Sequence, residues 1–161
     1  MADLLFRLAD FTSAADRDLF IAMLDHYSRD QFGGGSPLAK EVAQVLPARW
    51  ADHPGAFTLL AIRGEQTLGM ANCLTSFSTF NARPRINIHD LIVHAKHRGL
   101  GVGRQLIEAV CQEASARNAC QVSLEVRADN HRARELYERC GFHGIEMPPG
   151  STSYLFGTRE L

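Results

Sequence analysis

The sequence predicts one mixed α/β domain in which strands alternate with amphipathic helices. The chain has 161 residues, enough for one substantial core. Residues 120–127 alternate strictly between apolar and polar side chains, as a half-buried strand does. Apolar side chains between residues 102 and 118 recur at helical spacing. No linker or internal repeat separates these segments, so we expect a single domain over residues 1–161.

The N-terminal part of the chain is predicted to form a strand and then two helices. Residues 4–8 have the composition of a short strand. Ser13 and Asp16 supply capping groups for a helix whose apolar residues have helical spacing. Residues 33–37 end this helix with three glycines, and the proline of this segment suits the first turn of a second helix that runs to Trp50.

Three strands are predicted in the middle of the chain. Residues 57–62 and 67–77 form the first two, with a turn at residues 64–65 between them. A second turn falls at residues 81–84. Residues 86–93 are mostly apolar, which indicates a strand near the centre of the sheet.

The C-terminal part is predicted to end in a helix and a strand. Asn130 can cap the helix, and Gly141 can end it in the left-handed conformation. Phe142 is then expected to pack behind the helix end. A turn at residues 148–150 precedes a last strand at residues 154–159.

Composition excludes several classes of function. The net charge is −1 and the isoelectric point is near 6.6, whereas sequence-independent nucleic-acid binding needs a basic face. The N-terminus lacks a signal-peptide stretch, and the longest apolar run, residues 56–62, is too short to cross a bilayer. The four cysteines form no CxxC pair, as expected for free thiols in a reducing compartment. We therefore expect a cytoplasmic protein that binds neither nucleic acid nor membrane.

The segment between the strand at residues 86–93 and the helix at residues 102–118 is a candidate anion-binding turn. Gly99, Gly101 and Gly103 alternate here, which permits unusual backbone angles and removes side chains that would hold a ligand away. The first turn of the helix then offers unpaired N–H groups to an anion, and a diphosphate suits such a site. The alternative is that the glycines serve turn geometry alone.

Two well-known phosphate loops do not fit this segment. The dinucleotide fingerprint GxGxxG fails in both registers, because Arg104 or Leu106 stands where the last glycine is required. A P-loop requires a Gly-Lys-Ser/Thr ending, which the sequence lacks. A dinucleotide-binding oxidoreductase is therefore disfavoured.

Three segments together carry a family resemblance. Arg98-x-x-Gly101-x-Gly103 has the form Arg/Gln-x-x-Gly-x-Gly/Ala, and residues 88–93 are an apolar strand leading into it. The form Asn-x-x-Ala-x-x-x-Tyr-x-x-x-Gly-Phe is matched by Asn130, Ala133, Tyr137, Gly141 and Phe142. Over residues 86–142 these segments resemble the GNAT family of N-acetyltransferases, whose acyl-CoA-binding motif, fourth strand and downstream signature have these forms.

The resemblance implies both a fold and an activity. The fold is a central mixed, mostly antiparallel sheet of six to seven strands, with parallel, splayed strands 4 and 5, flanked by about four helices. The activity is transfer of acetyl from acetyl-CoA, as co-substrate and without a metal, to a primary amine of a small molecule or peptide by direct attack in a ternary complex. The alternative is an acyl-CoA-binding sensor without turnover. Dimers are common in the family, but no segment of the sequence indicates one.

The resemblance also implies which residues bind the co-substrate. The backbone around the glycines would hold the diphosphate, the fourth strand would pair with the pantetheine arm, and the start of the last helix would lie on the far side. These residues are Leu91, Ile92, Val93, Arg98, Gly99, Leu100, Gly101, Val102, Gly103, Arg104, Asn130, Arg132 and Ala133. Arginines 98, 104, 132 and 134 are candidates for the adenosine phosphates, and a solvated surface charge is the alternative for each.

Acetyl transfer to an amine needs a proton donor and a proton acceptor. By the resemblance, Tyr137 would protonate the departing sulfur, although its helix position also suits core packing. Histidine is a side-chain type suited to accepting a proton near neutral pH, so His89 is a candidate base. Strict alternation would put His89 and Asp90 on opposite faces of their strand. Asp90, Glu125 or a water chain are the other candidates for the base.

By the resemblance, the acceptor wall would lie around the first two helices and the loops near them. Tyr27, Asp30, Phe80 and Asp90 are the candidate acceptor-binding residues, with core packing as the alternative for the aromatics. Histidines 89, 94 and 97 have no acidic or thiol partner at metal-ligand spacing, so no metal site is expected. Neither the acceptor amine nor the size of the acyl group can be read from the sequence.

Overall fold

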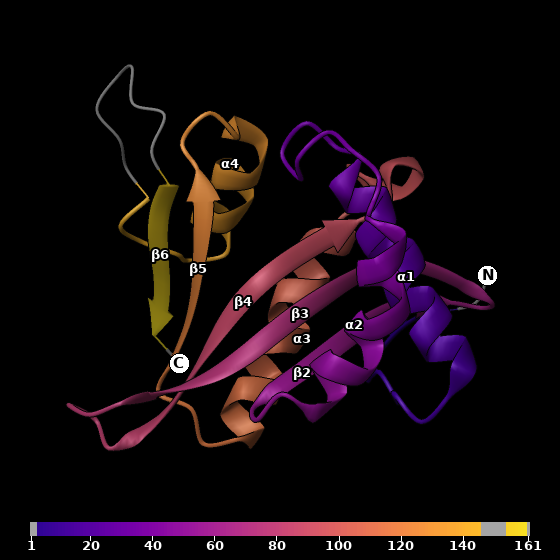
Figure 1. The fold of residues 1–161 in the computed structure, drawn as a ribbon. Coiled ribbons are helices and arrows are strands. Elements are labelled where there is room, and N and C mark those ends of the chain that lie inside the picture. Colours follow the sequence, from indigo (N-terminus) through magenta and orange to yellow (C-terminus); the bar gives the residue numbers. More distant parts are fainter. Residues whose placement is uncertain (1–2, 146–153, 161) are drawn as a thin grey trace.

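A central sheet organises the structure, a computed structural model in which residues 3–145 and 154–160 are described. The described residues form six strands, ordered β1-β2-β3-β4-β5-β6 across the sheet (Figure 1). The strands are β1 (Leu4–Leu8), β2 (Ala56–Arg63), β3 (Gln66–Ser78), β4 (Arg83–Val93), β5 (Gln121–Arg127) and β6 (Tyr154–Glu160). Only the β4–β5 pair is parallel within this sheet, and all other neighbours are antiparallel. The predicted turn at residues 148–150 lies outside the described residues.

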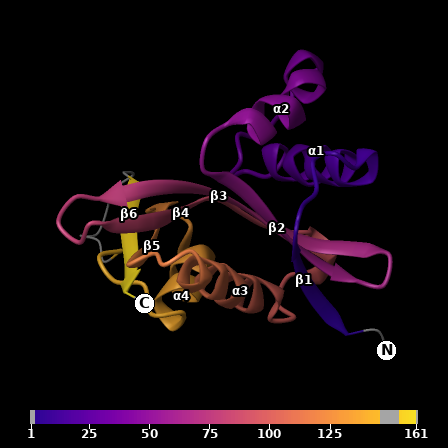
Figure 2. The same cartoon turned by 90° about the horizontal axis from the view of Figure 1, so that it is seen from below.

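Helices cover both faces of the sheet. The described α-helices are α1 (Ala14–Ser28), α2 (Lys40–Asp52), α3 (Val102–Ala116) and α4 (His131–Arg139), and a short 3-10 turn, η1, covers Ala95–His97. Figure 2 shows α1 and α2 on one face and α3 and α4 on the other. Each face has its own core cluster, one against α3 and α4 and a smaller one beneath α1 and α2. This confirms the predicted mixed sheet with four flanking helices. None of the described helices has the length and apolar character that crossing a membrane requires.

The predicted helix starts are right for α1, α3 and α4 and wrong for α2. Ser13 caps α1 and Asn130 caps α4, each accepting a backbone N–H through its side chain. The helix expected to begin at Pro37 begins instead at Lys40. Ala39, directly before Lys40, has extended backbone with ψ of 137°, and the N–H of Leu38 donates to Asp25 Oδ1 of α1 at 2.9 Å.

The parallel pair β4–β5 separates halfway along its length. β5 pairs with β4 only from Arg85 to Ile88, whereas β3 remains paired with β4 as far as Val93. After Ile88, β4 therefore has no strand partner on its β5 side, and the two ribbons diverge in Figure 1. This confirms the predicted splay of the parallel strands.

A β-bulge in β4 lies where the strands separate. Ile88 is opposite Cys73 and Asp90 is opposite Asn72, so His89 is the extra residue. Ile88 and Leu91, three residues apart, both pack toward the core cluster beneath α3, which strict alternation would forbid. The expected strict alternation at His89 and Asp90 is therefore wrong, because the bulge changes which face the following residues occupy.

Candidate active site

A cleft of about 810 Å³ lies where β4 has left β5, between the end of β4, the start of α3, α4 and the α1–α2 loop. Most of the predicted site residues line it: Tyr27, Asp30, Leu91, Ile92, Val93, Arg98, Gly99, Gly101, Val102, Gly103, Arg104, Asn130, Arg132, Ala133 and Tyr137. Leu100, His89, Asp90 and Phe80 are not among the lining residues. Four separate segments of the sequence thus meet at one site.

The glycine turn leaves room at the mouth of this cleft. Gly99 and Gly101 have φ of +81° and +79°, which only glycine adopts without strain. A Cβ on Gly99 would meet nothing within 4 Å, and one on Gly101 would meet only Gln105 Nε2 at 3.7 Å. Gly103 differs, because its Cβ would lie 3.1 Å from Leu136 Cδ2. Two glycines therefore shape an open turn, and the third lets α3 approach α4.

The N-terminus of α3 faces this open turn without a capping side chain. Gly101 is its N-cap and makes no side-chain hydrogen bond. The first N–H groups of a helix have no partner within the helix, and the positive end of the helix dipole lies there. An anion in the cleft can accept these hydrogen bonds. The arrangement fits the diphosphate predicted for it, since the space that a Cβ would fill is open.

The arginines near the cleft have different partners. Arg98 donates through Nε to Val93 O at 3.0 Å and forms an ion pair with Asp30 Oδ2 at 3.0 Å, so it joins the end of β4 to the α1–α2 loop. Arg134 does not line the cleft, and its NH1 donates to Ala128 O. Arg104 and Arg132 line the cleft and are exposed. Of the four candidate phosphate ligands, these two combine a position in the cleft with exposure to solvent.

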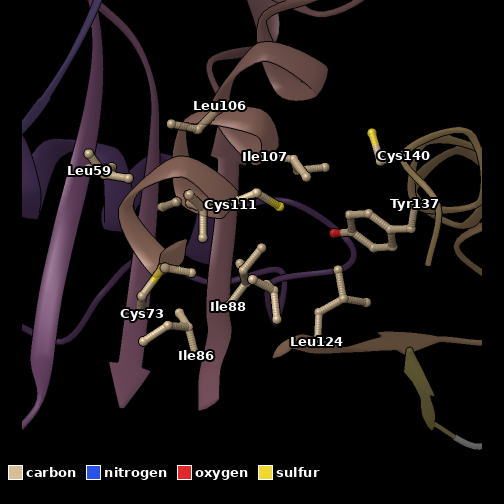
Figure 3. Packing of buried hydrophobic residues seen from close by; sticks show 14 of the residues in the cluster. Leu59, Cys73, Ile86, Ile88, Leu106, Ile107, Cys111, Leu124, Tyr137 and Cys140 are labelled. Carbon is tan, nitrogen blue, oxygen red and sulfur yellow. The ribbon is translucent and has the colours of Figure 1, made fainter. Parts of the chain in front are cut away.

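Tyr137 is the buried polar residue of the inner wall. Only 8% of its surface is exposed, and its ring packs against Phe142 at a centroid distance of 6.0 Å. Figure 3 shows the hydroxyl pointing from α4 toward the side chains of α3 and β4. Burial raises the pKa of Tyr137 above its ordinary value, and the nearby Tyr27 raises it further. The phenol therefore keeps its proton at neutral pH, so its O–H is present as a hydrogen-bond donor at the inner wall.

The α1–α2 loop forms the opposite wall. Asp30 Oδ1 accepts the N–H of Phe32 at 3.0 Å, and this bond together with Arg98 lowers the pKa of Asp30 despite partial burial. Phe32 lies under the Arg127 guanidinium of β5, 5.6 Å from ring centroid to Cζ. The loop therefore contacts the ends of both separated strands.

Four predicted residues lie away from the cleft lining. Phe80 is fully exposed in the β3–β4 turn, so it does not share a wall with Tyr27 and Asp30. Leu100 is also exposed, 62% of its surface being accessible. His89 is the exposed bulge residue directly before Asp90, whose Oδ2 accepts Asn72 Nδ2 at 2.9 Å.

Sequence reasoning missed one face of α4. His131, Glu135 and Arg139 line the cleft together with Leu136. The first three are spaced by four residues and therefore follow one side of the helix. The helical spacing could have identified them once Tyr137 was assigned to the site, but only the fold shows which side faces β4.

A cluster of three histidines lies beside the cleft. His26 of α1 accepts the N–H of Ala95 through Nε2 at 3.1 Å, and its ring stacks on His94 at 4.3 Å. His97 lies 5.8 Å from His94 and lines the cleft. Burial, followed by the charges of neighbouring groups including His26 and His97, lowers the pKa of His94. Among residues 3–145 and 154–160, no group of three or more His, Cys, Asp and Glu side chains could hold a metal ion.

Comparisons with known proteins point to one family. The sequence profile of the acetyltransferase (GNAT) family matches residues 20–142. The chain is 36% identical over 106 residues to N-alpha-acetyltransferase 40 of Saccharomyces cerevisiae, covering 62% of this chain and 36% of that protein. It is 29% identical over 135 residues to thialysine N-epsilon-acetyltransferase of Sus scrofa, covering 82% of this chain and 73% of that protein. The chain thus spans about a third of the yeast relative's length.

The fold is also found among solved structures. A chain of the NatC complex bound to Gag peptide and CoA superposes with a TM-score of 0.73, covering 99% of both chains at 18% sequence identity. At that identity the match shows a shared fold and leaves the acceptor open.

Proposed function

The chain belongs to the acetyltransferase (GNAT) family, and from that premise we propose that it transfers acetyl from acetyl-CoA to a primary amine of a small molecule or peptide. Enzymes of this family use acetyl-CoA. One observation carries the proposal: the cleft between the separated strands has an open glycine turn and an uncapped helix N-terminus at its mouth. An anionic group at the turn and an extended arm along β4 would fill it together.

Backbone groups supply most of the proposed co-substrate site. The diphosphate would accept N–H groups between Gly99 and Arg104, where the glycines keep side chains away. The pantetheine arm would lie along Leu91–Val93, whose β3 side is paired and whose β5 side has no strand partner. Arg104 and Arg132 would meet the adenosine phosphates. Asn130 Oδ1 accepts Ala133 N–H at 3.2 Å, so these two residues would act by setting the start of α4 beside the ligand.

The chemistry requires a neutral amine next to the thioester. An alkyl amine with a pKa of about 10.4 is only about 0.1% neutral at pH 7, so removing its proton increases the reactive fraction. The amine nitrogen would attack the thioester carbonyl, the C–N bond would form and the C–S bond would break. Tyr137, which retains its proton, would protonate the departing sulfur. The amine proton would leave through His89, Asp90, Glu125 or water.

The acceptor would approach from the α1–α2 side. Asp90 lies on that face of the sheet, two residues before Ile92, which packs beneath α1 and α2. Its carboxylate would bind a cationic amine, and Tyr27 and Asp30 would form the wall above it. The names of the two relatives describe an N-alpha and an N-epsilon acetyltransferase, so an amine is the common acceptor chemistry.

A thiol-release assay tests this function. Purified protein is mixed with acetyl-CoA and, in turn, a peptide with a free N-terminus, Nα-acetyl-lysine, thialysine, 1,4-diaminobutane and kanamycin. Acceptor-dependent release of CoA thiol, with acetylated product seen by mass spectrometry, is the expected result. Tight acetyl-CoA binding in a calorimeter without release on any amine would favour the sensor instead. Failure to bind acetyl-CoA would contradict the proposed site itself.

A further inference from the structure

Four polar side chains form a continuous hydrogen-bonded chain from α2 to β4. Trp50 Nε1 donates to Thr58 Oγ1 at 3.0 Å, and Thr58 Oγ1 donates to Asn72 Oδ1 at 2.7 Å. Asn72 Nδ2 then donates to Asp90 Oδ2 at 2.9 Å. The chain crosses β2 and β3 and ends at the strand that borders the cleft.

The direction of this chain is fixed by the groups at its two ends. An indole N–H can only donate, so the Thr58 hydroxyl accepts from Trp50 and donates its own O–H to Asn72. Because the carbonyl oxygen of Asn72 accepts that hydrogen bond, the amide N–H₂ of Asn72 points toward β4. A carboxylate can only accept, and Asp90 completes the sequence. Each bond therefore has one allowed orientation, and successive donors polarise one another toward Asp90.

The hydrogen-bonded series of side chains orients Asp90 directly after the β-bulge in β4. Asp90 is the first residue after the bulge at His89 and is directly opposite Asn72 across the strand pair. Thr58 and Asn72 are each only 1% exposed, so their side chains cannot turn to other partners in solvent. Asp90 is partly exposed. One carboxylate oxygen is thus occupied by a rigid interior donor, and the carboxylate has a defined orientation at the acceptor side of β4.

We propose that Asn72 is a positioning residue, which orients the Asp90 carboxylate to bind a positively charged acceptor amine. Thr58 and Trp50 act one and two steps further away by fixing the orientation of the Asn72 amide. The proposal rests on the proposed function, since it assigns a purpose to the acceptor side of the same site. It limits the acceptors to amines that arrive as cations, and it predicts weaker recognition of neutral analogues.

The competing explanation is that the chain only satisfies buried polar groups. Buried hydroxyl and amide groups are costly without partners, and a closed set stabilises any core. If that were its only role, breaking the hydrogen bonds would lower the melting temperature and would not affect KM for the amine more than binding of acetyl-CoA. A positioning role makes a sharper claim: the effect appears in KM for the amine and depends on the presence of Asp90.

The decisive experiment is a double-mutant cycle between Asn72 and Asp90. The substrates are acetyl-CoA and whichever amine of the panel above the wild-type protein acetylates fastest. Asn72→Leu removes the donor, and we expect KM for the amine to rise about tenfold or more, as for loss of a hydrogen bond to a charged group. The acetyl-CoA dissociation constant should change by less than about twofold. In an Asp90→Asn background the same substitution should leave KM for the amine within about twofold, because the carboxylate to be oriented is gone.

A second pair of variants tests the same chain with a milder change. Thr58→Val removes the hydroxyl at nearly constant shape, and Thr58→Ser keeps it. Thr58→Val should raise KM for the amine and Thr58→Ser should restore it, and this pair decides the outcome if Asn72→Leu does not fold. An unchanged KM in folded Thr58→Val, or an Asn72→Leu effect that persists without Asp90, overturns the positioning role while leaving acetyl transfer intact. A wild-type protein that binds acetyl-CoA but acetylates no amine overturns both proposals together.

Discussion

Gly101 and Gly141 provide a matched pair for testing the diphosphate site. Both have left-handed backbone, with φ of +79° and +83°, and neither has a close neighbour at the position of a Cβ. Substitution by alanine at either position therefore costs about 1–2 kcal/mol of backbone strain. For a domain of this size each kcal/mol lowers the melting temperature by about 2–4 °C, so both variants should melt about 2–8 °C lower. Only Gly101 lines the cleft.

The two variants should differ in ligand binding. In Gly101→Ala the new methyl group stands at the uncapped start of α3, and the strained turn moves its N–H groups away from the diphosphate. Loss of one hydrogen bond to a charged group is worth about 1.5–3 kcal/mol, which weakens CoA binding at least about tenfold. Gly141→Ala should bind CoA as the wild type does. Calorimetric titration with CoA measures both, and equal affinity in the two variants would refute the idea that this turn holds the diphosphate.

Two further substitutions test the chemistry and the histidine cluster. Tyr137→Phe keeps the ring packed on Phe142 but removes the proton donor, so kcat should fall by about 10- to 10⁴-fold with CoA affinity unchanged. Unaltered steady-state turnover would remove Tyr137 from the mechanism. Because the fold lowers the pKa of His94, the unfolded chain takes up a proton near the ordinary value of 6.5 while the folded chain does not. Stability from this group is therefore present above pH 6.5 and lost as the pH falls below it, so the wild-type melting temperature should drop more than that of His94→Asn between about pH 7.5 and about pH 5.5. Equal slopes for the two proteins would contradict this.

Local patterns predict the parts of the fold that depend on local forces. The Ser13 and Asn130 caps and the left-handed Gly141 each depend on groups within a few residues, and the structure confirms all three. The alternating pattern correctly predicts the strand β5, but Ser123 is buried between Val122 and Leu124. The start of α2 is predicted three residues too early, and Leu38, just before that start, donates to Asp25 of α1 instead. A contact over 13 positions has no signature in a local pattern.

In the candidate site, too, local patterns predict some features, whereas others depend on contacts between distant residues. Motif spacing selected the glycine turn, and the structure brings it next to the end of β4 and α4. The bulge at His89 was not predictable, because an extra residue in a strand is defined only by the register of its partner β3. The same register places Asn72 opposite Asp90. The hydrogen-bonded side chains that end there cannot be recognised in the sequence, where successive members are 8, 14 and 18 residues apart. Phe80 is predicted in the acceptor wall as an aromatic residue together with the family resemblance, whereas the structure puts it in the exposed β3–β4 turn.

The separation of β4 from β5 has a consequence for turnover. In the proposed site, an unpaired strand edge and a helix N-terminus would bind the CoA portion of acetyl-CoA, which is unchanged after the acetyl group has been transferred. CoA, the product, should therefore bind with nearly the same affinity as acetyl-CoA and compete with it. We therefore expect product inhibition by CoA, so that the reaction rate depends on the ratio of acetyl-CoA to CoA.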